Sequence, residues 1–126
     1  MSESRRDPIV RTVPQPADMN GNGDIFGGWM LSQMDLAGSI IATQTAKTRV
    51  ATIGIEAMRF EKPVLIGDEV SCYCSVERIG RTSITIHIES WARNRLQETA
   101  RKVTEGKFTY VAIDENGKPV PVIRGK

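Results

Sequence analysis

The stretch GWMLSQMDLAGSIIATQTAK, Gly28 to Lys47, decides the fold of this chain. It contains no proline, and its apolar residues cover almost every side of a helical wheel, which predicts a buried α-helix. These residues are Trp29, Met30, Leu31, Met34, Leu36, Ala37, Ile40 and Ile41. Asp35 lies between Met34 and Leu36, where an unpaired buried carboxylate is costly. We therefore expect Asp35 to have partners or a chemical purpose.

The residues before this helix predict a short strand and a polar loop. Residues 8–13, PIVRTV, alternate well enough for a strand, which Pro14 and Pro16 end. Residues 15–27 follow as a loop, because they are rich in residue types that tolerate turn conformations. Those residues are Asn20, Gly21, Asn22, Gly23 and Asp24.

Four long runs rich in β-branched and aromatic residues follow the helix, and they predict four strands. The runs are VATIGIEAMRFEKP from Val50, VSCYCSVERIG from Val70, TSITIHIESWARN from Thr82 and GKFTYVAID from Gly106. In the third run, Ile84, Ile86 and Ile88 share one face, whereas Thr85, His87, Glu89 and Trp91 share the other. This alternation is typical of an antiparallel sheet with one buried face. Short turns between consecutive strands predict a meander.

A single apolar helix followed by such a sheet has one economical arrangement, in which the curved sheet wraps the helix and each covers the other's apolar surface. This is the hotdog fold, an α+β fold with a long antiparallel sheet around one central buried helix. The length of 126 residues suits one domain. We expect a single domain over residues 1–126, with a core at about 9–121 and short flexible ends.

Composition excludes several functional classes. The net charge is only +2, and basic and acidic residues are interleaved, so nucleic acid is not an expected partner. The first residues, MSESRRDP, lack the apolar core of a signal peptide, and no stretch is long and apolar enough to span a bilayer, so we expect a cytoplasmic protein without a membrane partner. Cys72 and Cys74 do not have metal-ligand spacing, which predicts reduced structural thiols and no metal site.

The string NGNGDIFGGWMLSQMD, Asn20 to Asp35, closely resembles the signature of the hotdog-fold acyl-CoA thioesterases, most of all the YciA-type bacterial acyl-CoA hydrolases. The resemblance extends from about Ile9 to Pro121. Its specificity lies in the combination of Asn20, Gly23, the Gly27-Gly28 pair and Asp35 at fixed spacing, because each of these alone is a weak signal.

The resemblance implies hydrolysis of an acyl-CoA thioester to a carboxylic acid and free CoA. It implies that Asp35 and Asn20 lie at the reaction centre and that the Gly28 N–H polarises the thioester carbonyl. It also implies a homodimer as the minimal active unit, often assembled into hexamers as a trimer of dimers. No cofactor is expected, since coenzyme A is part of the substrate and of the product.

The residue types fit this chemistry. N–H donors at a helix N-terminus stabilise a developing oxyanion, and glycine allows the substrate close to the backbone. A thiolate leaves readily, so Asp35 could act as general base or as nucleophile, and the sequence does not choose between them. Asn20 would hold water or substrate. Structural alternatives stay open: a turn or cap for Asn20, tight helix packing for Gly27-Gly28, and a structural hydrogen bond for Asp35.

Other residues are weaker candidates. Basic groups beside glycine turns suit the CoA phosphates, which makes Arg59, Lys62 and Arg81 candidates for that contact. Ser83 is a further candidate for the same contact. His87, the only histidine, is expected to be a surface or sheet-packing residue. Two rival functions remain, a hotdog hydratase or dehydratase, which commonly relies on a histidine, and a non-catalytic acyl-CoA-binding module.

The spacing of Gly28 and Asp35 predicts a site shared between two chains. The two residues are seven positions apart, which on one helix is about 10 Å along the axis. A carbonyl at the Gly28 N–H is therefore poorly placed for attack from the same chain's Asp35. A two-fold dimer with antiparallel neighbouring helices would bring Asp35 of one chain beside Asn20 and Gly28 of the other.

Overall fold

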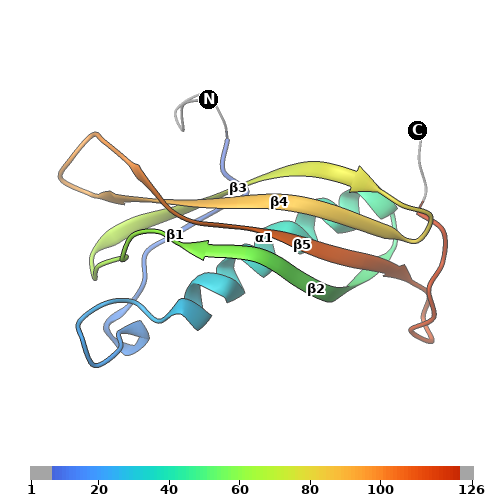
Figure 1. The fold of residues 1–126 in the computed structure, drawn as a ribbon, viewed down its shortest axis with the longest axis horizontal. Coiled ribbons are helices and arrows are strands. Elements are labelled where there is room, and N and C mark those ends of the chain that lie inside the picture. Colours follow the sequence, from blue (N-terminus) through green and yellow to red (C-terminus); the bar gives the residue numbers. More distant parts are fainter. Residues whose placement is uncertain (1–6, 123–126) are drawn as a thin grey trace.

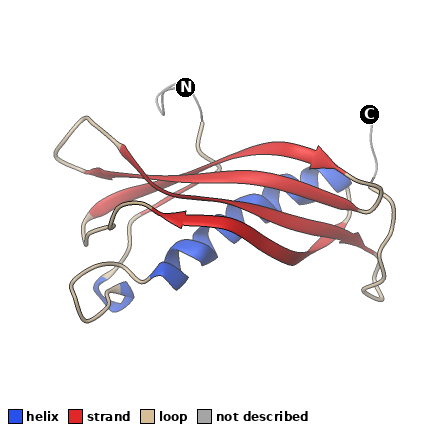
Figure 2. Ribbon diagram, in the orientation of Figure 1, coloured by secondary structure: helices blue, strands red, loops and turns tan. Residues whose placement is uncertain are grey.

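The computed structural model describes residues 7–122, and one long helix lies across a curved sheet in it (Figure 1). This is the predicted hotdog arrangement, with a single five-stranded antiparallel sheet packed against one main helix (Figure 2). The predicted flexible ends lie largely outside the described residues. The elements are β1 (Val10–Thr12), the 3-10 helix η2 (Pro16–Asp18), α1 (Gly27–Ala46), β2 (Arg49–Phe60), β3 (Asp68–Ile79), β4 (Ser83–Asn94) and β5 (Arg101–Ile113).

The element boundaries follow local chemistry closely. Helix α1 begins at Gly27, one residue before the predicted start, and ends at Ala46 because Lys47 adopts a left-handed conformation with φ 61°. The loop predicted over residues 15–27 contains the short helix η2, which the sequence did not predict. Strand β5 begins at Arg101, upstream of the predicted run that starts at Gly106.

The prediction that all four long strands form a meander is wrong for β2. The sheet order is β1-β3-β4-β5-β2, so only β3, β4 and β5 follow one another as a meander. Strand β2 pairs with β5 and forms the edge of the sheet opposite β1 (Figure 1). Residues 61–67 connect β2 to β3 and are long enough to cross the end of the sheet, so the chain is not forced into a hairpin there.

One face of the sheet packs against one face of α1. Ile84, Ile86 and Ile88 of β4 are completely buried, as the alternation predicted. The prediction of a helix buried on all sides is wrong for the single chain, because one sheet covers only one side of a helix. Leu36 is 51% exposed. The buried helix residues are Met30, Met34, Ala37, Gly38, Ala42 and Ala46.

Two further expectations can be compared with the structure. Cys72 is buried and Cys74 half-buried, and neither is disulfide-bonded in the structure; that both are reduced remains a prediction. Within residues 7–122, no helix has both the length and the apolar character needed to cross a membrane.

Candidate active site

The Asp35 carboxylate is held by two hydroxyl groups from the sheet. Oδ1 of Asp35 accepts hydrogen bonds from Thr52 Oγ1 at 2.8 Å and from the Tyr110 hydroxyl at 2.9 Å. The Tyr110 hydroxyl also lies 3.1 Å from the Asp35 carbonyl oxygen. Asp35 is half-buried rather than fully buried, which corrects the prediction, because α1 is covered on one side only. Within residues 7–122, the partners of the Asp35 carboxylate are hydroxyl donors and not cations.

Thr52 and Tyr110 are direct neighbours across the β2–β5 ladder. Both side chains lie on the face of the sheet that contacts α1, since both contact Asp35. The ladder shifts register immediately after Thr52, between Thr52 and Gly54. Such a bulge re-aims the side chains beside it. The two hydroxyls that bind one oxygen of Asp35 thus belong to a cross-strand pair of residues.

Burial keeps Tyr110 a hydrogen-bond donor. The Tyr110 side chain lies in the core beneath α1, and this burial, followed by the neighbouring Asp35 carboxylate, raises the pKa of the phenol far above its ordinary value. The phenol therefore stays protonated throughout the physiological pH range. A protonated hydroxyl beside a carboxylate donates to it.

Asn20 uses its side-chain oxygen to shape the loop before α1. Asn20 Oδ1 accepts the N–H of Asn22 at 2.8 Å and the N–H of Asp24 at 3.1 Å, and the Asn20 N–H donates to the Asp24 carbonyl. The structural alternative, in which Asn20 stabilises a turn, is therefore confirmed for its side-chain oxygen. Phe26, and not Asn20, is the N-cap residue of the helix. The side-chain NH2 group of Asn20 remains available to a ligand, and this group can only donate hydrogen bonds.

The glycine pair at the start of α1 leaves backbone donors open. Among residues 7–122, no acceptor lies within hydrogen-bond reach of the Gly27 and Gly28 N–H groups, whereas the Trp29 and Met30 N–H groups donate to the Phe26 carbonyl. A Cβ atom at Gly28 would meet nothing within 4 Å, so packing inside the chain does not require glycine there. At Gly27 it would lie 3.4 Å from the Phe60 ring.

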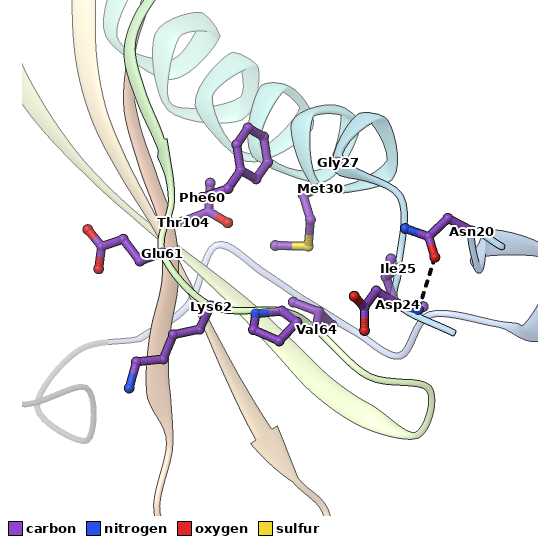
Figure 3. A pocket seen from close by; sticks show the side chains of 11 residues that line it. Asn20, Asp24, Ile25, Gly27, Met30, Phe60, Glu61, Lys62, Val64 and Thr104 are labelled. Atoms are coloured by element: carbon purple, nitrogen blue, oxygen red, sulfur yellow. Dashed lines mark hydrogen bonds between the residues drawn. The ribbon is translucent and has the colours of Figure 1, made fainter. Parts of the chain in front are cut away.

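A cavity of about 340 Å³ opens beside the first turn of α1. Ile25, Met30 and Val64 form its apolar wall, with Asn20 and Asp24 on one side and Lys62 on the other (Figure 3). The remaining lining residues are Gly27, Phe60, Glu61, Pro63 and Thr104. Asp35 does not line this cavity. Within one chain, Asn20 and the helix start therefore lie together, whereas Asp35 lies farther along α1 with Thr52 and Tyr110.

The four candidates for CoA phosphates do not come together within one chain. Lys62 lines the cavity near the start of α1. Arg59 lines a second hollow with His87 and Glu105. Arg81 and Ser83 lie at the β3–β4 turn, and Ser83 pairs with Val111, near the end of β5. Since Phe60 pairs with Thr104 near the start of β5, Lys62 and Arg81 lie toward opposite ends of the sheet.

His87 lies on the face of the sheet away from α1, as a surface or sheet-packing histidine would. Its Nε2 atom is 3.0 Å from Glu105 Oε1, and its Nδ1 atom is 4.0 Å from Glu89 Oε2. The three side chains form a group of possible metal ligands that the sequence did not predict. Lys102 Nζ already lies 3.1 Å from Glu105 Oε2. This group is separated by the sheet from the helix that carries Asp35.

Thr52 and Tyr110 are the site residues that sequence reasoning missed. Tyr110 alternates with Phe108 and Ala112 on the buried face of β5, and a tyrosine on an apolar face needs a partner for its hydroxyl. That signal pointed to a buried polar contact but not to Asp35. Thr52 carried no comparable signal, because a threonine in a strand is ordinary.

Comparisons with known proteins agree with this architecture. A family model described as the thioesterase superfamily matches residues 22–99. The acyl-CoA thioester hydrolase YciA of Salmonella typhimurium is 48% identical over 117 residues, which cover 90% of this chain and 88% of the relative.

Two crystal structures are similar over nearly the whole chain. The hexameric thioesterase y2039 from Yersinia pestis has a TM-score of 0.88 and 47% identity, covering 94% of this chain and 96% of that chain. An aspartate-to-alanine mutant of HI0827, a hexameric broad specificity acyl-coenzyme A thioesterase, has a TM-score of 0.91 and 41% identity, covering 95% and 88%. With its helix, sheet and sequence all matched, this chain belongs to the thioesterase superfamily.

Proposed function

We propose that the protein hydrolyses acyl-CoA thioesters to a carboxylic acid and free CoA, with Asp35 as the reacting carboxylate. The observation that carries this proposal is the carboxylate of Asp35, the only charged residue of α1, held on one oxygen by Thr52 and Tyr110. Relatives that are acyl-CoA thioester hydrolases by name support the substrate class. The histidine on which a hydratase would commonly rely lies on the far face of the sheet.

Two routes use the same carboxylate. As general base, Asp35 takes a proton from water while the water oxygen attacks the thioester carbonyl carbon; the C–S bond then breaks, and the thiolate leaves with the electron pair. As nucleophile, Asp35 attacks the carbonyl carbon itself, expels the thiolate and forms an anhydride that water opens. Both routes use water and groups of the chain and require no cofactor.

The start of α1 supplies the complementary donors. The free Gly28 N–H stabilises the oxyanion that develops on the thioester carbonyl, a contribution of about 3 kcal/mol for one such donor. The Asn20 NH2 group donates to the attacking water or to the substrate oxygen. The apolar wall of the adjoining cavity, Ile25, Met30 and Val64, receives the acyl chain.

We infer that a complete site needs two chains. Strand β2 is a long edge strand, and it carries three exposed apolar side chains, Ile53, Ile55 and Phe60, at 60%, 43% and 54% exposure. An edge of this length with apolar side chains is a template for pairing with another copy. A two-fold pairing there with antiparallel helices brings Asp35 of one chain toward Asn20 and Gly28 of its partner.

Hexameric relatives support a larger assembly of three such dimers. In this assembly, basic residues from different chains, including Lys62 and Arg81, approach the phosphates of one CoA molecule. Lys62 and Arg81 can then contact the same CoA molecule, although they lie far apart along the sheet of a single chain.

The proposed function is tested by comparing the wild type with Asp35→Asn in a thiol-release assay on saturated acyl-CoA. The variant should remain folded with kcat lowered at least about a hundredfold, as expected for a lost general base or nucleophile. Asp114→Asn, a turn carboxylate distant in sequence from the helix, is the control. Near-normal turnover by folded Asp35→Asn would reject the role of Asp35.

A further inference from the structure

The two oxygens of the Asp35 carboxylate have different surroundings. Oδ1 faces the hydroxyls of Thr52 at 2.8 Å and Tyr110 at 2.9 Å. For Oδ2, the described part of the chain offers no hydrogen-bond donor. A carboxylate has room for about four hydrogen bonds over its two oxygens, so this distribution is strongly one-sided.

The two donors come from two different strands and converge on one atom of the helix. Asp35 projects from α1, Thr52 from β2 and Tyr110 from β5, and the last two are paired across the sheet. A carboxylate held by a single donor keeps rotational freedom, whereas two donors from different strands fix both its rotamer and its plane. The carboxylate of Asp35 is therefore oriented before any substrate binds.

Gly38 provides the space that this arrangement needs. Gly38 lies one turn after Asp35 on the buried side of α1, and a Cβ atom there would overlap the Tyr110 hydroxyl and lie 2.7 Å from Ile88 Cδ1. Only the absence of a side chain at Gly38 lets the hydroxyl pass beneath the helix to Asp35. Glycine in a helix interior is less stable than alanine, so its presence here has a local reason.

We propose that Thr52 and Tyr110 are positioning residues that anchor Oδ1 of Asp35 and so assign the chemistry to Oδ2. This rests on the proposed function of Asp35. Oδ2 is then the atom that accepts the proton of the attacking water, or that attacks the carbonyl carbon itself. Neither hydroxyl touches the reacting atoms, so both act through the orientation of the carboxylate.

The orientation matters because reacting atoms must be held within narrow limits. A displacement of about 1 Å can lower a rate about a hundredfold. Loss of one of two anchors leaves the carboxylate partly held, so we expect a fall in kcat of about tenfold for each single variant. KM should change little, because neither hydroxyl contacts bound substrate.

The test compares Tyr110→Phe, Thr52→Val and Thr52→Ser by kcat and KM in the thiol-release assay. Thr52→Val is close to isosteric, and Thr52 is exposed on an edge strand, so this variant keeps the proposal testable even if Tyr110→Phe fails to fold. Thr52→Ser retains the hydroxyl and should recover most of the wild-type kcat. Tyr73→Phe and Thr85→Val remove hydroxyls on the other face of the sheet and should leave kcat unchanged.

The double variant Asp35→Asn/Thr52→Val tests whether Thr52 affects kcat by positioning Asp35 or independently of Asp35. If Thr52 acts through Asp35, the double variant should be no slower than Asp35→Asn alone. A hundredfold loss in Asp35→Asn with normal kcat in both Thr52→Val and Tyr110→Phe would overturn this inference and leave the proposed function intact. Normal kcat in Asp35→Asn would instead overturn the proposed function.

Discussion

Gly38 and Tyr110 compete for one space, because a Cβ atom on Gly38 would overlap the Tyr110 hydroxyl. Gly38→Ala should therefore lower the thermal midpoint, measured at fixed protein concentration, despite the better helix propensity of alanine. We expect a net loss of about 1 to 3 kcal/mol from overpacking.

The double variant Gly38→Ala/Tyr110→Phe is the matched control for that measurement. Removing the hydroxyl relieves the tightest contact, so stability should be partly restored, as a coupled pair requires. A Gly38→Ala protein as stable as the wild type would show that the helix and β5 separate easily at this point.

The shared site predicts complementation between two inactive variants. Asp35→Ala removes the carboxylate, and Asn20→Asp removes the NH2 donor but keeps an oxygen for the Asn22 and Asp24 N–H groups. After subunit exchange, half of the dimers are mixed and have one intact site of two, so about a quarter of wild-type activity should return. Activity that stays absent despite demonstrated exchange would argue for a site within one chain.

The apolar cavity predicts turnover of several acyl chain lengths. Met30 lines this cavity, and methionine adapts to different shapes. Met30→Ala should enlarge it and raise kcat/KM for long acyl chains relative to short ones. Leu96→Ala, a change at an almost fully exposed residue, is the control. A wild type that accepts only one polar or aromatic acyl group would contradict this picture.

The hydrogen bonds of Glu105 predict that the free energy of unfolding falls at acidic pH. Hydrogen bonds from Lys102 and then from His87 lower the pKa of Glu105 in the folded protein. Because the unfolded chain binds the proton first, the stabilising contribution is present above about pH 4.3 and is lost as the pH falls through the folded pKa.

Urea unfolding at two pH values measures this contribution. At pH 7, Glu105→Gln should be less stable than the wild type by up to about 1 kcal/mol, since the groups are partly exposed. At about pH 3 the difference should shrink. Glu98→Gln, on an exposed loop, should show no such trend. An equal difference at both pH values would mean that the Glu105 charge is not responsible.

The two cysteines should be unreactive in the native protein. Burial, and then the neighbouring Cys72, raise the pKa of Cys74 to about 12, and burial raises the pKa of Cys72. Only the thiolate reacts with iodoacetamide. Mass spectrometry should therefore show no adducts at pH 8 without urea and two adducts in urea. Alkylation of a chain that stays folded would refute the prediction.

Local sequence patterns were sufficient for the long helix and the four long strands, but not for the short helix η2 or for the start of β5. The helix from Gly27 to Ala46 and the alternation of Ile84, Ile86 and Ile88 could be predicted because backbone periodicity acts over a few residues. The grouping of Asn20, Gly28 and Asp35 as one candidate site came from their spacing and from the resemblance to a family, and their catalytic roles remain predictions.

Only the tertiary structure decided which elements are neighbours. Strand β2 lies beside β5 rather than β3, and this places Thr52 opposite Tyr110 and both against Asp35. Seventeen residues separate Asp35 from Thr52, and seventy-five separate it from Tyr110. No local preference links such distant residues, because their contact depends on how the sheet as a whole covers the helix. The sequence determined that a single charged residue, a carboxylate, stands in the helix among apolar neighbours, and long-range packing determined which of its oxygens is left free.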